Sequence, residues 1–455
     1  MQPVLAIALL SIRNAIRSKL VLILLFLLIV IIILLPLSIK GDGTISGFIQ
    51  VLLSYTLGIS TFILALTSLW AGSASVSTEI NARTIQMIAC KPVNTAQIWM
   101  GKWLGLCALN AVFLSICVVV TYGMLHWHLN RADQNANEQA RILLTARQER
   151  SPILPDLQQN ARNELNRRLN ESPSPEGVSR EQTLKSIHQQ LLAEFYTVRP
   201  GGRKRWEFNS FPIHSDRQTV TLQYRFSSSV IGQNIVRGRW LIGTSEQPDL
   251  FDIAKESVPR ALNEIHFVMD HRWDGKSLIL TYVDLDQAGA TMLFDFDKGL
   301  LLLTPEGSFA GNYTRAALIL FGQLAFFTAL GITAGCLFSL PVAAFTSIFL
   351  LIMIHMGSYI QGIAMTEITW PWQATLESEA TTWFTIVVTL IFRGMAFVMS
   401  PLVHESALNS VSTGRIVDIW WTVRGFLLQG VAYSVFFGWC ASILLKRREL
   451  ALPQT

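Results

Sequence analysis

One polar stretch decides how this chain is organised: Glu79-Ile-Asn-Ala-Arg-Thr-Ile-Gln-Met-Ile-Ala-Cys-Lys-Pro-Val-Asn-Thr-Ala-Gln-Ile-Trp-Met-Gly-Lys102. It lies between two apolar runs, each long enough to cross a bilayer. Ser77 and Thr78 are helix-capping residue types, and Glu79 would place a negative charge in a first turn, so a helix is expected to begin there. Pro92 has no N–H and disfavours helix at the preceding residue, so the helix is expected to end there. The pattern predicts either a short helix to which a partner protein could bind or an ordinary solvated loop.

Composition indicates a membrane protein. Of 455 residues, 51% are hydrophobic and 15% are charged, whereas soluble domains carry about 25% charged residues. The net charge of +5 follows from basic residues in segments expected on the cytoplasmic side, as the positive-inside rule predicts. It therefore does not indicate nucleic-acid binding. These basic residues are Arg13, Arg17, Lys19, Arg83, Lys91, Lys102, Lys446, Arg447 and Arg448, against Glu79 and Glu449.

Apolar runs predict six transmembrane helices, preceded by an interfacial helix at residues 3–18 with Leu5, Leu9, Ile12 and Ile16 on one face. A secretory signal is the alternative for the first run, but no small-residue cleavage site follows it, so a retained span is expected. The six predicted spans are Leu20–Leu37, Phe48–Ala71, Trp103–Leu125, Thr314–Phe338, Val342–Ile363 and Phe426–Leu445.

A large polar insert, 127–311, separates an N-terminal membrane half, 1–126, from a C-terminal half, 312–455. Its first part, 131–196, has a helical pattern over 131–149, 155–170 and 180–195. Its second part, 203–305, alternates apolar and polar residues, as in Val220, Leu222 and Tyr224, and predicts a small antiparallel β-sandwich. The insert contains no cysteine, so it must fold on its own apolar core without disulfides.

A further apolar segment, 381–402, is expected to be an amphipathic or re-entrant helix at the outer face. Arg393 falls in its middle, and a charge at the bilayer centre costs about 2.5–3.5 kcal/mol. Another crossing would also place the basic cluster at Lys446 on the outer side, against the positive-inside rule. A seventh span is the alternative.

Several motifs resemble permease subunits of the ABC transporter type-2 exporter family. In the polar stretch these are Glu79, Arg83-Thr84, Lys91-Pro92-Val93 and Gly101-Lys102. The segment 307–342 resembles family members with a large extracytoplasmic insert between spans three and four. Ser400-Pro-Leu and Val417-Asp-Ile-Trp-Trp resemble the family's outer linker, where an amphipathic helix precedes the last span. The family usually has Gly or Lys before the Thr, where this chain has Ala82-Arg83, which weakens the match at that position.

The resemblance implies a separate cytoplasmic ABC ATPase that binds ATP and Mg, so that this chain carries no cofactor. It implies that the ATPase docks on the loop 79–98 through Glu79, Arg83, Thr84, Lys91 and Pro92. A half-transporter of six spans would pair as a homodimer or with a paralogous permease in the inner membrane, with both termini cytoplasmic. The insert would be extracytoplasmic and could meet a partner protein there.

The chain shows no energy source of its own. Asp274-Gly-Lys-Ser277 resembles the end of a phosphate loop, but the pattern requires glycine at Asp270. The predicted spans contain no Asp, Glu, Lys or Arg in their interiors, and His355 is their one titratable residue, so proton or sodium coupling is not indicated.

Candidate sites in the insert are weaker. Arg199, Arg203, Lys204 and Arg205 flank Gly201-Gly202 and could contact an anion such as a lipid headgroup, or form a solvated turn. A hydrolytic centre of His214, His266, Asp270 and His271 lacks a serine elbow. Carboxylates such as Asp284 and Asp286 alternate along strands, which indicates a solvated face rather than a calcium site. The non-transport alternative is a membrane-anchored binding or assembly protein whose insert recruits a partner.

Overall fold

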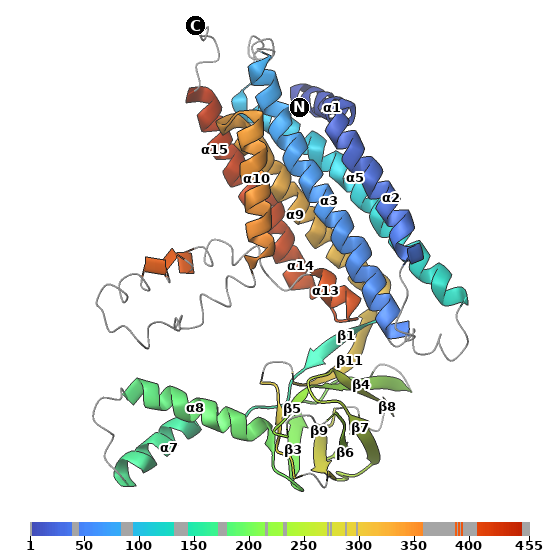
Figure 1. Ribbon diagram of the computed structural model, residues 1–455, viewed down its shortest axis with the longest axis vertical. Helices are drawn as coiled ribbons and strands as arrows, with labels where there is room; N and C mark the ends of the chain where they lie inside the picture. The colour runs from blue at the N-terminus through green and yellow to red at the C-terminus, as the bar shows by residue number, and fades with distance from the viewer. Residues whose placement is uncertain are drawn as a thin grey trace. The chain divides into compact units, whose positions relative to one another are not determined.

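The chain divides into two units, which are described separately. One unit comprises Met1–Leu144 with Ser308–Thr455, and the other is Thr145–Gly307. The structure, a computed structural model, is shown in Figure 1. It describes residues 2–38, 45–82, 94–131, 144–171, 180–213, 217–230, 234–270, 273, 275–286, 289–296, 299–357, 387–388, 390–391, 393–394 and 407–447.

The predicted interfacial helix is present as α1 (Gln2–Arg17), followed by α2 (Lys19–Ser38) after a bend of 74°. The apolar residues Leu5, Leu9 and Ile16 are exposed on α1, as a lipid-facing surface would be. The opposite face, with Ile7 and Ala8, is buried.

Three long helices form the centre of the membrane unit: α3 (Ile45–Asn81), α5 (Thr95–Arg131) and α9 (Phe309–Leu337). The prediction that a helix begins at Ser77 or Thr78 is wrong, because both residues lie in the last turns of α3. Their hydroxyls donate to the carbonyl oxygens of Ser73 and Ala74 four residues back. Serine and threonine inside a helix commonly bond this way, so a capping residue type alone does not mark a start.

The C-terminal part contains α10 (Leu340–His355), α13 (Ala407–Ser412), α14 (Ile419–Gly425), the π-helix η2 (Phe426–Tyr433) and α15 (Ser434–Arg447). Among the described residues, four helices are long and apolar enough to cross a membrane, or five if α1 and α2 count as one bent span. Helix α10 is apolar but shorter. The last span begins at Ile419, earlier than expected. The chain is thus multi-pass, while the exact count of six spans stays a prediction.

The expected outer helix at 381–402 lies largely outside the described residues. The structure describes only 387–388, 390–391 and 393–394 there, and these are helical. The predicted end of the fifth span at Ile363 is also outside the described part.

The insert begins with β1 (Thr145–Arg150) rather than with the end of a helix, so the prediction of helix over 131–149 is wrong for its last residues. Strand β1 lies beside β11 in a sheet, and Arg150 contacts Thr304 and Glu306 of that strand. Pairing with a distant strand thus overrides the local helical preference. The next two predicted helices are confirmed as α7 (Leu157–Glu171) and α8 (Arg180–Tyr196).

The β-rich part forms three sheets, of orders β1-β11-β4-β8, β2-β10-β5 and β3-β9-β6-β7, where a sandwich would have two. The remaining strands are β2 (Thr197–Val198), β3 (Arg203–Phe208), β4 (Gln218–Tyr224), β5 (Phe226–Ser228), β6 (Val236–Thr244), β7 (Phe251–Ser257), β8 (Asn263–Met269), β9 (Leu278–Asp284), β10 (Met292–Phe294) and β11 (Leu300–Ser308).

All three sheets contribute to one apolar core. At its centre the Trp240 ring lies 4.8 Å from the rings of both Tyr224 and Tyr282, centroid to centroid. The predicted inward face Val220, Leu222 and Tyr224 is fully buried. The insert therefore folds around a core of its own, as the absence of cysteine requires.

Candidate functional site

The ends of α3 and α5 flank residues 83–93, the centre of the predicted docking segment. Helix α5 begins with a reciprocal cap: the Gln97 N–H donates to the Asn94 carbonyl at 2.9 Å, and the Asn94 N–H donates to Gln97 Oε1 at 3.1 Å. The side-chain bond from Gln97 to the Asn94 N–H is one half of a capping box and satisfies a backbone donor where the helix starts.

An ion pair joins the two helices beside this segment. Lys102 Nζ on α5 lies 2.7 Å from Glu79 Oε1 on α3, and it also donates to the Ser75 carbonyl at 2.6 Å. The side chains are 3% and 13% exposed, respectively. Because burial removes water from both charges, each charge is stabilised mainly by the other. Loss of one partner would leave the remaining charge buried and uncompensated. The pair therefore ties the end of α3 to the beginning of α5.

Helix α1 packs against the same end of α5 through two glycines spaced four apart. A Cβ at Gly105 would lie 2.4 Å from the Ala8 carbonyl oxygen, and one at Gly101 would lie 2.9 Å from that of Val4. Such spacing of small residues lets helix backbones approach closely in a membrane. The motif is visible in the sequence but was not used to predict this contact.

A second pair of glycines on α9 packs against α3. A Cβ at Gly335 would lie 2.4 Å from the Ser73 carbonyl oxygen, and one at Gly331 would lie 2.7 Å from that of Leu69. Helix α9 also meets α5, where Asn110 Nδ2 donates to Thr328 Oγ1 at 3.0 Å and Trp103 Nε1 donates to the Ala325 carbonyl at 3.0 Å. Helices α3, α5 and α9 therefore form one closely packed group, shown together in Figure 1.

Comparison with protein families gives a match over this region. Residues 5–144 match the family model described as ABC-2 family transporter protein. This part of the chain is therefore similar to the ABC-2 transporter family, which supports the resemblance that the motifs in the polar stretch indicated. The match contains α2, α3, α5 and most of α1, with the Glu79–Lys102 pair and the two α5 glycines that contact α1. No curated protein and no solved structure matches the chain.

The match supports a transport permease role, and together with the long apolar helices it supports a multi-pass membrane protein. Membrane subunits of the ABC-2 family are generally non-catalytic and generally work with an ATPase subunit. Of the predicted coupling residues, Glu79 is the one whose contacts the structure describes. Arg83, Thr84, Lys91 and Pro92 lie outside the described residues.

The four basic residues predicted to contact an anion do not share one surface. Arg203 and Arg205 are exposed on one face of β3, whereas Lys204 lies on the other, where it donates to the Glu194 carbonyl at 2.8 Å. Arg199 is exposed before the glycine turn. The Gly201 N–H, which could have received an anion, donates to Asp284 Oδ2 at 2.9 Å.

The expectation that the strand carboxylates form a solvated face fails at Asp284, which is buried. It accepts from Gly201 N–H and also from Asp286 N–H at 3.0 Å. Gly201 has φ of +64°, a conformation that glycine adopts readily, so the turn presents its amide to this carboxylate. Within the described residues, no group of three or more His, Cys, Asp or Glu could hold a metal ion.

The histidines of the insert are not brought together in the described part of the chain. His266 on β8 contacts Thr221 Oγ1 through Nδ1 at 2.9 Å, and its Nε2 lies 3.8 Å from Glu264 Oε2. Partial burial of the His266 ring, whose side chain is 45% exposed, lowers its pKa; the charge of Glu264 opposes this shift, and those of Arg147 and Lys255 add to it. His214 and His271 lie outside the described residues.

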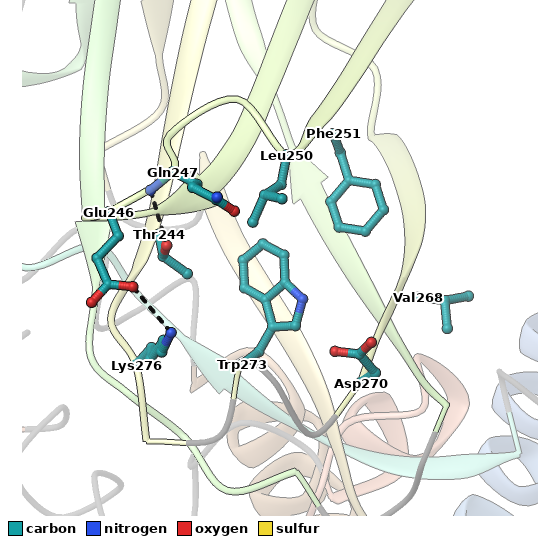
Figure 2. A pocket seen from close by; sticks show the side chains of 9 residues that line it. All are labelled: Thr244, Glu246, Gln247, Leu250, Phe251, Val268, Asp270, Trp273 and Lys276. Carbon is teal, nitrogen blue, oxygen red and sulfur yellow. Dashed lines mark hydrogen bonds and ion pairs between the residues drawn. The ribbon is translucent and has the colours of Figure 1, made fainter.

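The insert contains a pocket that the sequence did not reveal. Nine residues line it: Thr244, Glu246, Gln247, Leu250, Phe251, Val268, Asp270, Trp273 and Lys276 (Figure 2). They come from two connections, β6–β7 and β8–β9, and from the strand ends beside them. The sequence indicated Asp270 only as a possible catalytic residue. The pocket was not predicted, because nothing in the local sequence shows that the two connections lie close together.

Proposed function

We propose that this chain is the permease subunit of an ATP-driven exporter whose motor is a separate cytoplasmic ABC ATPase. The match of residues 5–144 to the ABC-2 family model carries the proposal. The ATPase would bind ATP and Mg and dock on the segment 79–98. Glu79, Arg83, Thr84, Lys91 and Pro92 are the residues proposed to couple the two subunits.

The packing around this segment supports a route for mechanical coupling. Movement of a docked ATPase would act on residues 83–93, which join α3 to α5. Because the Glu79–Lys102 pair holds these helices together at that point, both would respond to the same push. Helix α3 would pass the movement to α9 through the close contacts at Gly331 and Gly335.

The proposed setting is the inner membrane, with both termini and the docking segment cytoplasmic and the insert extracytoplasmic. Two copies, or one copy and a paralogous permease, would enclose the transport pathway. The insert would belong to the subgroup with a large domain between spans three and four, where it could meet lipid or a partner protein. Labelling of single cysteines introduced at 79–98, from one side of sealed vesicles at a time, tests this orientation.

Co-purification tests the proposed pairing. The full-length tagged chain is purified from native membranes in mild detergent, and retained ATP hydrolysis is measured. Wild type should retain a protein with a phosphate loop, and Arg83→Glu should lose it. Arg180→Glu, the same charge reversal at an exposed position of α8, is the matched control and should retain it.

Two results would count against the proposal: wild type without any retained ATPase, or equal retention by Arg83→Glu. The first result, together with capture of a partner by the insert alone, is what a membrane-anchored assembly protein would give. Nucleotide-dependent transport in vesicles that contain both subunits would separate the two functions directly.

A further inference from the structure

Five polar side chains meet inside the membrane unit, where α3, α5 and α9 pack together. They are Thr56 and Ser60 of α3, Cys117 and Thr121 of α5, and Tyr313 of α9, and none is more than 3% exposed. Cys117 lies beside Ser60, and Tyr313 lies beside both Thr121 and Cys117. Thr56 shares a face of α3 with Ser60, because residues four apart are neighbours on a helix surface. We call these five side chains the polar layer.

The hydrogen-bonding capacity of the polar layer is only partly used. The Tyr313 hydroxyl donates to the Val118 carbonyl at 3.2 Å, so its proton is already committed. The hydroxyls of Thr56, Ser60 and Thr121 form no hydrogen bond of ordinary geometry within the described part of the chain. The Cys117 thiol beside Ser60 is a weak partner at best. A buried hydroxyl in this situation is costly, and such groups in folded proteins commonly bind ordered water.

Other buried hydroxyls in these helices are satisfied by the protein itself. Thr67 Oγ1 donates to the Ile63 carbonyl of the same helix at 2.8 Å. Thr328 Oγ1 donates to the Leu324 carbonyl at 2.8 Å and accepts from Asn110 Nδ2 at 3.0 Å. The polar layer therefore differs from these positions in its unused hydrogen-bonding capacity, although all of them are buried.

The chemistry of the polar layer indicates a small neutral ligand. None of its five members is an acidic or basic residue, so a bound ion would have no opposite charge, which is expensive in a buried place. Hydroxyl groups both donate and accept hydrogen bonds. Water does the same, and a buried water molecule typically forms about three hydrogen bonds to groups of this kind.

We propose that the polar layer is a hydration site, in which ordered water bridges the hydroxyls of α3 to the Thr121 hydroxyl of α5 beside Tyr313. The Glu79–Lys102 pair and the glycine contacts join the helices directly, whereas this layer joins them through an exchangeable solvent molecule. Water binding here does not depend on the proposed pairing with an ATPase.

Thermal unfolding of the full-length chain in mild detergent tests the proposal. Thr56→Val and Thr121→Val keep the shape of the side chain but remove one bond to water, so each should lower the midpoint by at least about 2 °C. A variant that combines both with Ser60→Ala no longer holds water. Its loss should therefore be smaller than the sum of the three single losses.

Thr67→Val is the matched control for these substitutions. Thr67 is buried in the same helix, and its hydroxyl is satisfied by the Ile63 carbonyl. The Ile63 carbonyl keeps its backbone hydrogen bond when that hydroxyl is removed. The midpoint of Thr67→Val should therefore stay nearly unchanged.

Exchange of the Cys117 thiol with heavy water gives an independent measurement. Two chains are compared, with either Cys117 or Cys107 as the one remaining cysteine, and the infrared S–H band is followed after transfer to heavy water. Cys107 is buried in the same helix and lies beside Thr328, in the part of the seam that is satisfied without water. The Cys117 thiol should exchange at least about tenfold faster than the Cys107 thiol.

Three results would each overturn the proposal. Unchanged or higher midpoints for Thr56→Val and Thr121→Val would show that these hydroxyls are buried without a ligand. Additive losses in the combined variant would show that the three hydroxyls share no water. Exchange of Cys117 no faster than that of Cys107 would show that water does not reach the layer.

Discussion

Lys102 is buried where it meets Glu79, and this ion pair links two membrane helices beside the proposed docking segment. Removing one member of a buried pair leaves the other charge without compensation, which typically costs about 3–5 kcal/mol. We therefore expect Lys102→Met or Glu79→Gln alone to lower the thermal unfolding midpoint of the purified chain markedly. The double variant should recover much of the loss, because two neutral side chains need no compensation.

An exposed pair in α8 is the control for this prediction. Lys185 and Glu181 are 3.5 Å apart, with side chains 73% and 77% exposed. Exposed pairs of this kind contribute about 0.3–0.5 kcal/mol, so Glu181→Gln should leave the midpoint nearly unchanged. If the double variant at 79 and 102 is no more stable than either single one, the ion pair is not what joins the helices.

His266 should make the β4–β8 pair sensitive to pH. Burial lowers its pKa below the ordinary value of about 6.5, so the unfolded state takes up a proton before the folded state does. Stability therefore falls as pH decreases through about 6.5. Hydrogen exchange of β8 amides, corrected for intrinsic rates, should show less protection at about pH 5.5 than at about pH 7.5.

The variant His266→Gln has no imidazole to protonate and should show a smaller difference between the two pH values. The α9 amides, in the other unit, are the internal reference. An unchanged difference in His266→Gln would mean that another group causes the pH dependence.

The sequence alone predicted the roles of some single residues but not of their partners. Glu79 was singled out as a charge in an expected first turn and by the family resemblance, but its partner Lys102 lies 23 residues away. Finding that partner requires the helical register on both sides of the intervening segment. Asp284 was interpreted as solvated, because period-two alternation cannot show that a distant glycine turn covers the strand end.

Among the helices, the close approach of α1 to α5 gives the sharpest prediction. A Cβ at Gly105 would lie 2.4 Å from the Ala8 carbonyl oxygen, which a backbone atom cannot easily accommodate. We expect Gly105→Ala to separate the helices and destabilise the membrane unit by about 1–3 kcal/mol. A detergent titration of thermal unfolding would measure this effect.

Gly123 in the same helix is the matched control. A Cβ there meets nothing within 4 Å, so Gly123→Ala should be neutral or stabilising by up to about 1 kcal/mol, as alanine is the better helix former. Equal effects of the two substitutions would show that helix propensity, and not packing against α1, determines the outcome.

Helices and strands with a clear hydrophobic periodicity were predictable from the sequence. Those whose secondary structure depends on contacts with distant residues were not. The alternation around Leu222 predicted β4, and the apolar runs predicted the membrane helices. Residues 145–149 were assigned to a helix, but they pair with β11, more than 150 positions along the chain. The prediction of a helix start at Ser77 was wrong because α3 continues through this residue. The Ser77 hydroxyl bonds to a carbonyl within the helix instead of capping a helix start.

For the molecule as a whole, the insert should fold when it is expressed alone. The buried residues of its apolar core lie within 196–302, and Thr145–Gly307 forms a compact unit of its own. We expect a fragment of residues 145–307 to unfold cooperatively in urea. Trp240→Ala in the same fragment should cost about 3–5 kcal/mol, because Trp240 is fully buried.

A fragment that lacks a cooperative transition, or a Trp240→Ala fragment as stable as its parent, would contradict this prediction. Composition and the lack of cysteine were enough to anticipate an independent core. The arrangement of its strands into three sheets was not predictable, because many pairings satisfy the same alternation.

The pairing of β1 with β11 has a consequence for how such a chain could arise. The polypeptide enters the β-rich unit on β1 and leaves it on the neighbouring strand β11. The first and last strands of the insert therefore lie side by side. A domain whose two ends are adjacent can be inserted into a loop between two helices, or deleted from it, by one genetic event. Replacing 145–307 by a few glycines and serines should therefore yield a minimal protein that still inserts into membranes.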